Sequence, residues 1–369
     1  MVDGLGPSKA SSVLTIDLGA LKRNYYLLAS RARTAECAAV VKANGYGLGI
    51  EQVFHALNEA GCATFFVATL DEAITLRMLK RSPTVYYLNG LLPGEAEICR
   101  TKRIRPTLND PGQIEYWAKY CSAKRESLPA AIHIDTGMSR LGLTSRETAA
   151  VVAKPRCLKA FDFTLLLSHL ACGEMPYHPM NVQQRDQFSN AANALPHAPR
   201  SLAASSGIFL GADWHFDMVR AGVSLYGVSP QPDLPNPMEQ VIQLQGKIIQ
   251  VRDVDTPQTV GYGATYRVNG PMKVATVAAG YADGYPRNLD DQRVAYIGNK
   301  IAPIIGRVSM DLITLDISSA PEAKPGDMVD LIGPHNNLDA VAASTDTIGY
   351  ELLTRLGHRY RRRYIETTT

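Results

Sequence analysis

The sequence predicts an α/β fold, a (β/α)8 barrel followed by a predominantly β C-terminal domain. Eight short apolar or β-branched runs alternate with amphipathic stretches between about residues 13 and 228. Past about residue 235, strand-like runs separated by Gly, Asn and Pro turns replace this alternation. Eight strand-helix alternations in about 220 residues fit a TIM barrel better than an open doubly wound sheet, which usually has fewer strands.

Each strand candidate of the barrel is a short run followed by a helix-like segment in which apolar residues recur at intervals of three and four. The first segment, VLTIDLGALKRNYYLL (13–28), is expected to supply an extended lead-in and the helix that precedes the first strand. The clearest helix candidates are 51–61, 71–82, 113–123 and 180–195. The strand candidates are 37–43, 64–69, 84–89, 104–108, 130–135, 162–169, 201–205 and 219–228.

The predicted domain boundary lies near residue 234. The segment QPDLPNPM (231–238) carries three prolines and is typical of a linker. We therefore expect a barrel over 13–234 and a β-rich domain over 235–369. Within the second domain, the pair Gly298-Asn299 between two apolar runs predicts a hairpin.

Composition narrows the functional classes. The 38 basic and 35 acidic residues leave a net charge of +3, too small to indicate nucleic-acid binding. One basic cluster, RYRRR (359–363), is interpreted as a solvated final strand or tail. The six cysteines are scattered without the spacing of a zinc site or disulfide framework, so no metal is expected. Because the sequence lacks a signal-peptide pattern and any run of eighteen apolar residues, we expect a cytoplasmic protein without a membrane segment.

The segment VVKANGYGLG (40–49) places Lys42 at the end of a β-branched run, directly before a glycine-rich turn. A primary amine at the mouth of a buried strand can be desolvated, which disfavours its charged form and makes it a nucleophile toward an aldehyde. Glycines at 45, 47 and 49 would let the backbone approach a phosphate, and Tyr46 could donate its hydroxyl. Taken alone, the segment fits a barrel strand with an ordinary edge lysine and a flexible turn better than it fits a cofactor site.

Other polar residues also follow predicted strands, and the active site of a TIM barrel lies at the carboxyl ends of its strands. The residues at or just after strand ends are expected to meet at one mouth of the barrel. They are Lys42, 135–140, His169, Ser205 and Arg220.

Reading these strand ends in order gives VKANGYG, HIDTGMSRLG (133–142), SHLA (168–171), SS (205–206) and FDMVRAGVSLYG (216–227). Together with GYGAT (261–265), AGYADGYPR (279–287) and GRVSMD (306–311), they closely resemble the alanine racemase family of fold-type III enzymes. The resemblance covers residues 13 to 363. It implies pyridoxal 5′-phosphate (PLP) as cofactor and racemisation of L- and D-alanine, supplying D-alanine for peptidoglycan.

The resemblance assigns the two catalytic bases. Lys42 corresponds to the lysine that binds PLP covalently and acts as one base, and Tyr262 to the tyrosine that acts as the other. In the family that tyrosine comes from the partner subunit, which implies a homodimer with shared active sites. Two bases on opposite faces of Cα suit a reaction that removes a proton from one face and returns it to the other.

Further roles follow from the same resemblance. Arg220 corresponds to the arginine that faces the pyridine nitrogen, and His169 to the histidine that links this arginine to the catalytic tyrosine. Arg140 resembles the arginine near the ring hydroxyl and the substrate. The phosphate-binding group is Tyr46, Ser205, Gly222, Val223 and Tyr350. The residues assigned to the lining of the substrate pocket are Arg140, Met310, Asp311 and Tyr281. Two further residues, Arg287 and Arg307, are assigned to the access route.

Two positions depart from the family pattern. His133 stands where many members carry a lysine modified to a carbamate that holds the neighbouring arginine. Arg140 would then need another acceptor, an anion such as chloride, or water, because a buried unpaired guanidinium is costly. Ala204 stands where an asparagine commonly precedes the phosphate-binding serine.

Three alternatives remain open at this point. A racemase of broader specificity, acting on serine or lysine, would share these motifs. A fold-type III decarboxylase is expected to place an acidic residue and a cysteine where this chain has Arg220 and Tyr262. A non-catalytic PLP-binding protein would resemble the barrel half only and would lack GYGAT and SMD.

Overall fold

The computed structural model describes residues 10–288 and 293–368, which divide into two compact units. The barrel unit contains 22–225 and 229–238. The β unit contains the described residues up to Leu21, together with 226–228 and the chain from Glu239 onward.

The barrel unit contains eight parallel strands in the order β8-β7-β6-β5-β4-β3-β2-β9. A parallel bridge between Ala204 and Arg220 joins the two ends of this order, so the barrel is nearly closed. The predicted fold class is confirmed. The strands are β2 Glu36–Val40, β3 Thr64–Val67, β4 Thr84–Tyr87, β5 Arg105–Leu108, β6 Pro129–His133, β7 Asp162–Leu167, β8 Arg200–Ser201 and β9 Met218–Ala221.

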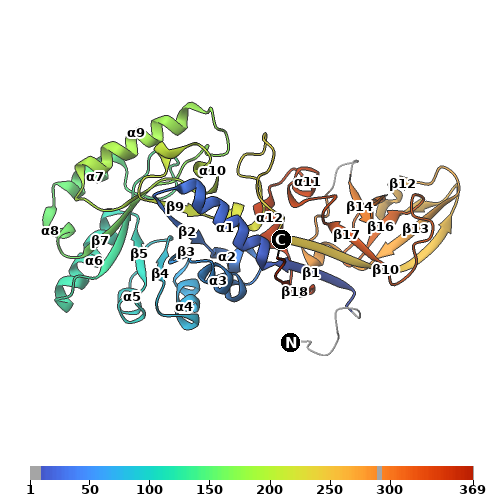
Figure 1. The fold of residues 1–369 in the computed structure, drawn as a ribbon, viewed down its shortest axis with the longest axis horizontal. Helices are drawn as coiled ribbons and strands as arrows, with labels where there is room; N and C mark the ends of the chain where they lie inside the picture. Colours follow the sequence, from blue (N-terminus) through green and yellow to red (C-terminus); the bar gives the residue numbers. More distant parts are fainter. Residues whose placement is uncertain (1–9, 289–292, 369) are drawn as a thin grey trace. The chain divides into compact units, whose positions relative to one another are not determined.

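Helices lie around the outside of these strands (Figure 1). Some of these helices begin at a capping residue, such as Thr69, which accepts a hydrogen bond from the backbone N–H of Glu72, and Asp110, which accepts one from Gln113. The helices are α1 Leu18–Ala32, α2 Lys42–Tyr46, α3 Ile50–Glu59, α4 Leu70–Leu79, α5 Ala96–Lys102, α6 Pro111–Lys124, α7 Ser145–Val152, α8 Pro155–Leu158, α9 Pro179–Ala194 and α10 Ser205–Ile208.

The last two barrel strands are shorter than the sequence predicts. The predicted strand 201–205 ends at Ser201, and Ser205 instead begins α10. The predicted strand 219–228 ends at Ala221. The reason is a contact between two loops, because the Ser205 hydroxyl accepts hydrogen bonds from the backbone N–H groups of Gly222 and Ser224, which would otherwise continue the ladder.

The β unit contains an eight-stranded sheet with the path β15-β14-β17-β10-β1-β18, while β13 pairs with β10 and β16. Gly298 and Asn299 connect β14 to β15, as predicted for a hairpin. The strands are β1 Ser12–Asp17, β10 Ile242–Val254, β11 Thr259–Val260, β12 Tyr266–Arg267, β13 Met272–Val277, β14 Val294–Ile297, β15 Lys300–Pro303, β16 Ile313–Asp316, β17 Met328–Ile332 and β18 Arg361–Ile365; the helices are α11 Leu338–Ala343 and α12 Gly349–Arg355.

The first strand differs from its predicted role. β1 pairs antiparallel with β10 and parallel with β18, so it is a central strand of the β unit and not a lead-in to the barrel. Its partners lie more than 220 residues away in sequence, and no local pattern encodes such a pairing. The segment 229–238 groups with the barrel unit. Across the described parts of the chain, none of the helices has the length and apolar character to cross a bilayer.

Candidate active site

The turn that carries Lys42 is left-handed. After β2 ends at Val40, the backbone of Ala43, Asn44, Gly45 and Tyr46 has φ values of 53°, 56°, 63° and 51°. This conformation costs roughly 1–2 kcal/mol for each residue with a side chain, so the surrounding hydrogen bonds must hold it. At position 45 a side chain would also meet Val53, because an added Cβ would lie 3.2 Å from its Cγ2 atom, which favours glycine there. The turn follows β2, so Lys42 lies at the carboxyl end of the barrel.

Glu72 supplies one of the bonds that hold this turn. One carboxylate oxygen accepts the backbone N–H of Ala43 at 2.6 Å, and the other accepts the N–H groups of Ala68 at 2.9 Å and Thr69 at 3.3 Å. One side chain therefore connects the end of β3 and the start of α4 to the Lys42 turn. The Asn44 side chain adds a second bond by accepting the N–H of Ile50 at 2.9 Å.

The electrostatic environment lowers the pKa of Lys42. Burial is the largest cause, and the positive charges of Arg140 and Arg220 act in the same direction, while Glu72 opposes them. The amine therefore loses its proton more easily than an exposed lysine does. This is the property that the sequence analysis expected of a lysine at the end of a buried strand.

Arg220, on β9, is a buried cation that is held by neutral acceptors. Its side chain donates to the carbonyl and hydroxyl oxygens of Ser201 at 2.9 and 2.7 Å and to the carbonyl of Ser168 at 2.5 Å. Within the described ranges, no carboxylate forms an ion pair with it. Burial lowers its pKa to about 10, so the guanidinium remains charged at neutral pH.

His169 contacts the same guanidinium. Arg220 Nη2 lies 3.3 Å from Nδ1 of His169. The pKa of His169 is well below its usual value, first because of burial and then because of the charges of Arg220, Arg140 and Lys42. A neutral imidazole whose Nδ1 accepts from an arginine carries its proton on Nε2. The arginine thus sets the tautomer of the histidine.

His133, the departure from the family pattern, is a neutral and hydrogen-bonded side chain. Its Nδ1 lies 2.9 Å from the side-chain oxygen of Asn109, and burial together with Arg220 and Arg140 lowers its pKa to about 3. Arg140 is exposed, which corrects the premise that its guanidinium is buried in this chain. No described carboxylate pairs with Arg140, and the expectation of a bound anion or water beside it stays a prediction.

A polar cradle lies beside the Lys42 turn, where the loop after β8 meets the loop after β9. The Ser205 hydroxyl binds the N–H groups of Gly222 and Ser224 at 2.9 and 3.2 Å. A Cβ atom at Gly222 would come within 2.9 Å of the Tyr46 hydroxyl oxygen, so only glycine lets the tyrosine approach this closely. Val223 follows in a buried 3-10 turn.

The remaining predicted residues lie in the β unit. Tyr262 is 68% exposed, and Met310 and Asp311 are exposed as well. The loop that carries Tyr281 is bonded to the loop that carries Met310, because the N–H groups of Tyr281 and Ala282 donate to the carbonyls of Ser309 and Met310. The structure thus brings AGYADGYPR and GRVSMD together. Exposed residues elsewhere in the unit include Arg287, Arg307 and Tyr350 of α12.

Sequence reasoning missed two residues of this site. Glu72 and Ser201 bind the Lys42 turn and Arg220 respectively. The pattern Thr69-x-x-Glu72 is a capping box and predicts the start of α4, but not the contact with Ala43. No pattern in the neighbouring sequence indicates that Ser201 binds Arg220.

Comparison with known proteins gives a family for this fold and site. The model of the alanine racemase N-terminal domain matches residues 16–230, and the model of the C-terminal domain matches residues 241–364. The chain belongs to the alanine racemase family. Because both domains match, the alternatives of a fold-type III decarboxylase and of a PLP-binding protein that resembles the barrel half alone are set aside.

Individual alanine racemases are similar over nearly the whole chain. That of Rhodospirillum rubrum is 48% identical over 96% of both chains, and a catabolic alanine racemase of Agrobacterium fabrum is 45% identical over 97% of this chain and 93% of its own. The crystal structure of alanine racemase from Bartonella henselae with covalently bound pyridoxal phosphate superposes with a TM-score of 0.92. It is 41% identical and covers 96% of this chain and 100% of its own.

Proposed function

We propose that this chain interconverts L- and D-alanine by a two-base mechanism with PLP as cofactor. The observation that carries the proposal is Lys42, an amine of lowered pKa at the carboxyl end of the barrel and within the electrostatic influence of the buried Arg220. The names of its relatives, and the PLP bound covalently in the Bartonella henselae enzyme, support the substrate and the cofactor.

The residues around Lys42 fit PLP. The cofactor combines an aldehyde, a phosphate and a pyridine ring, and these need an amine, a set of N–H and O–H donors and an aromatic-sized space. Lys42 supplies the amine, and Tyr46, Ser205 and the backbone at Gly222 form the cradle in which a Cβ would collide with the tyrosine hydroxyl. Val223 and Tyr350 complete the proposed phosphate-binding group.

PLP, when bound, supplies an electron sink that stabilises negative charge on the substrate Cα. Lys42 takes or returns the Cα proton on one face, and its lowered pKa favours this role because the amine gives up its own proton more easily. Tyr262 acts on the opposite face. Arg140 lies near the ring hydroxyl and the substrate in this proposal.

Arg220 tunes the site by remaining charged. Its guanidinium faces the position of the pyridine nitrogen and cannot supply a proton as a carboxylic acid would, which makes the ring a weaker electron sink. The bonds from Arg220 to Ser201 and Ser168 hold it rigidly. His169, neutral with its proton on Nε2, donates from this nitrogen toward the catalytic tyrosine.

The second base comes from a partner subunit in this proposal. The β unit exposes Tyr262, Tyr281, Met310 and Leu312, and exposed apolar groups of this kind mark interaction surfaces. We propose a homodimer in which these residues, with Asp311, complete the pocket above the Lys42 of the other chain. Arg287 and Arg307 flank the access route.

Solvent deuterium exchange tests the reaction. Incubation of each alanine enantiomer in deuterium oxide should place deuterium on Cα of the inverted product, because the proton is removed and returned by different groups. Serine and lysine, tested in parallel, should turn over far more slowly. Exchange with complete retention of configuration would contradict the two-base mechanism, and preference for serine or lysine would establish the broader racemase instead.

Subunit complementation tests the shared site. Lys42→Ala and Tyr262→Phe each remove one base and should each abolish turnover as homodimers. Mixing the two variants under conditions that exchange subunits should restore about a quarter of wild-type activity, because half of the dimers are mixed and each contains one intact site. No recovery, with mixed dimers demonstrated by mass, would show that both bases come from one chain.

The cellular role is also a proposal. We infer that the enzyme acts in the cytoplasm and supplies D-alanine for peptidoglycan. The names of relatives include a catabolic alanine racemase and a biosynthetic one from Pseudomonas aeruginosa. Deletion of the gene should create a requirement for D-alanine, whereas growth without D-alanine but loss of growth on alanine as carbon source would assign the catabolic role.

A further inference from the structure

A cavity of about 360 Å³ opens at the amino ends of three adjacent barrel strands. It is lined by the starts of β4, β5 and β6, by the ends of α4 and α5, and by Trp117 of α6. Lys42 follows β2 at the carboxyl ends of the parallel strands, so the two sites lie at opposite ends of the barrel. Nothing in the racemase chemistry uses this cavity.

Five arginines line the cavity: Arg77, Arg81, Arg100, Arg103 and Arg105. A neighbouring cavity of about 250 Å³ shares three of them and adds Lys102. Such a density of guanidinium groups is unusual in a chain whose net charge is only +3.

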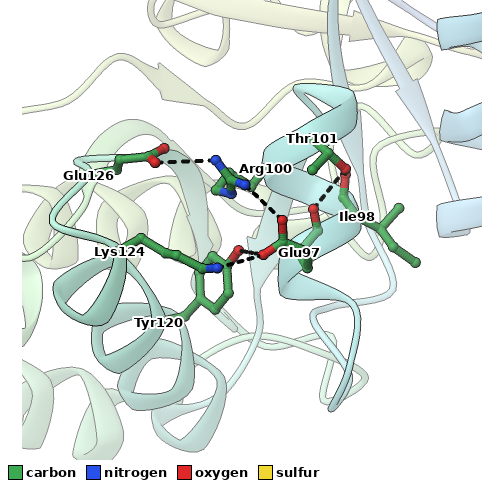
Figure 2. A network of polar contacts seen from close by, with 7 residues as sticks. All are labelled: Glu97, Ile98, Arg100, Thr101, Tyr120, Lys124 and Glu126. Carbon is green, nitrogen blue, oxygen red and sulfur yellow. Dashed lines mark hydrogen bonds and ion pairs between the residues drawn. The ribbon is translucent and has the colours of Figure 1, made fainter.

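Only one of the five is neutralised. Arg100 donates to Glu97 at 2.8 Å and to Glu126 at 3.2 Å, in a network that also includes Lys124 and Tyr120 (Figure 2). The other four have no carboxylate partner among the residues that the structure describes. Their charges are therefore unbalanced by the protein.

Arg77 is the most buried of the unbalanced four. Its terminal nitrogens donate to the backbone carbonyls of Arg81, Pro83 and Arg103, at 3.0, 2.5 and 2.5 Å, which fixes the guanidinium in place. Burial is the largest cause that lowers the pKa of Arg77, and repulsion by the charges of Arg105 and Arg103 lowers it further. Because carbonyl dipoles offset only part of this charge, an added anion would stabilise the folded barrel.

Three buried donors on residues that line the cavity lack partners. Among the described residues, Nε of Arg77, Nε of Arg100 and Nε1 of Trp117 form no hydrogen bond, and Trp117 as a whole is only 1% exposed. Arg105 donates to the Tyr86 hydroxyl at 2.9 Å. The lining therefore offers positive charge and hydrogen-bond donors but no carboxylate.

We propose that this cavity binds a small molecule bearing at least two phosphoryl charges, such as pyrophosphate or a nucleoside diphosphate. Guanidinium groups match phosphate oxygens bidentately, and four uncompensated arginines suit several negative charges. A volume of about 360 Å³ accommodates a small ligand and not a polymer. The site is separate from the cradle at Ser205 that serves the cofactor phosphate.

The arginines to change are Arg81 and Arg103. Both are exposed, and neither side chain forms a hydrogen bond within the described residues, so Arg81→Gln and Arg103→Gln should leave the fold intact. Arg125 is the matched control. Like Arg103, it caps a helix in the left-handed conformation, with φ of 55° against 54°, but it lies outside both cavities.

Calorimetric titration of the holoenzyme tests the site, because bound PLP then occupies the cofactor phosphate cradle. Pyrophosphate and ADP are titrated separately at fixed ionic strength, with chloride as the reference anion. Wild type and Arg125→Gln should bind one or both ligands with one site per chain. The double variant Arg81→Gln/Arg103→Gln should bind at least about tenfold more weakly, because two charge-assisted contacts are lost.

Two results would overturn the proposal. In the first, neither ligand produces a saturable signal beyond that of chloride. In the second, the double variant binds as tightly as Arg125→Gln. The second result would place the binding elsewhere on the chain. Circular dichroism of each variant establishes that any loss of binding does not come from unfolding.

Discussion

The carboxylate of Glu72 accepts the backbone N–H of Ala43 at 2.6 Å, one residue after Lys42. This bond ties the left-handed turn to the end of β3 and to the start of α4, and its acceptor also raises the pKa of the neighbouring lysine. The position and the basicity of Lys42 thus depend on the same side chain. Glu72 is a positioning residue, because it acts through the backbone.

Replacing Glu72 with Gln should weaken PLP binding. The amide has a single acceptor oxygen for the N–H groups of Ala43, Ala68 and Thr69, so at least one donor loses its partner, at a cost of about 1–3 kcal/mol. Loss of the negative charge should also lower the pKa of Lys42 further. Fluorescence titration with PLP measures the first effect, and the pH dependence of amine labelling measures the second.

The control for this change is Glu147→Gln. Glu147 forms the same kind of capping box, with Thr144 at the start of α7, and both variants should lose comparable helix-cap stability. Only Glu72→Gln should lose PLP affinity. Equal PLP affinity in both variants would show that Glu72 does not position the Lys42 turn for PLP binding.

Replacing Arg220 with Lys should destabilise the barrel although the charge is kept. A lysine cannot reach Ser201 and Ser168 with the geometry of the guanidinium, so buried oxygens lose their donors. We expect a loss of about 1–3 kcal/mol in the free energy of unfolding, measured with urea. Arg200→Lys, at a half-exposed ion pair with Asp217, should change it by less than about 1 kcal/mol. Similar losses in the two variants would contradict this reading of Arg220.

Stability should fall as the pH drops below about 6.5, the unfolded value of histidine. The pKa of His133 in the folded protein is about 3, so between these values the unfolded chain binds a proton that the folded chain does not. The free energy of unfolding then increases with pH through this window, by at most about 1.4 kcal/mol per pH unit for this residue. His133→Gln should flatten the slope in urea unfolding at pH 5 to 7, whereas replacing the exposed His335 should not.

Replacing Gly280 with Ala should disturb the two bonded loops that carry Tyr281 and Met310, which we propose line the substrate pocket. A Cβ at this position would lie 2.3 Å from the carbonyl oxygen of Met310, which forces the two bonded loops apart. We expect a loss of about 1–3 kcal/mol in stability and a raised KM for alanine. Gly173→Ala, where an added Cβ meets no atom closer than 3.5 Å, is the control. An unchanged KM for alanine would contradict the proposal that these loops contact the substrate.

The sequence predicted the barrel because each strand-helix unit carries its own signal. The β-branched and aromatic residues of TFFVAT (64–69) predict a strand, which the structure has at Thr64–Val67, and the apolar spacing of 180–195 predicts the helix α9 without reference to other segments. The same holds for the hairpin at Gly298. The strand 201–205 was too long because its end depends on bonds between Ser205 and a loop 17 residues later.

The sequence by itself predicted that Lys42 and His169 lie at the carboxyl ends of barrel strands, and β2 and β7 do end two residues before them. It did not predict where the strands near Ser205 and Arg220 end. Tertiary structure alone decided which of these residues touch, that Glu72 holds the Lys42 turn, and that β1 joins a sheet more than 220 residues away. The reason is physical. Strand and helix preferences come from neighbouring residues, whereas hydrogen bonds and charges act between groups that only the folded chain brings within a few ångströms.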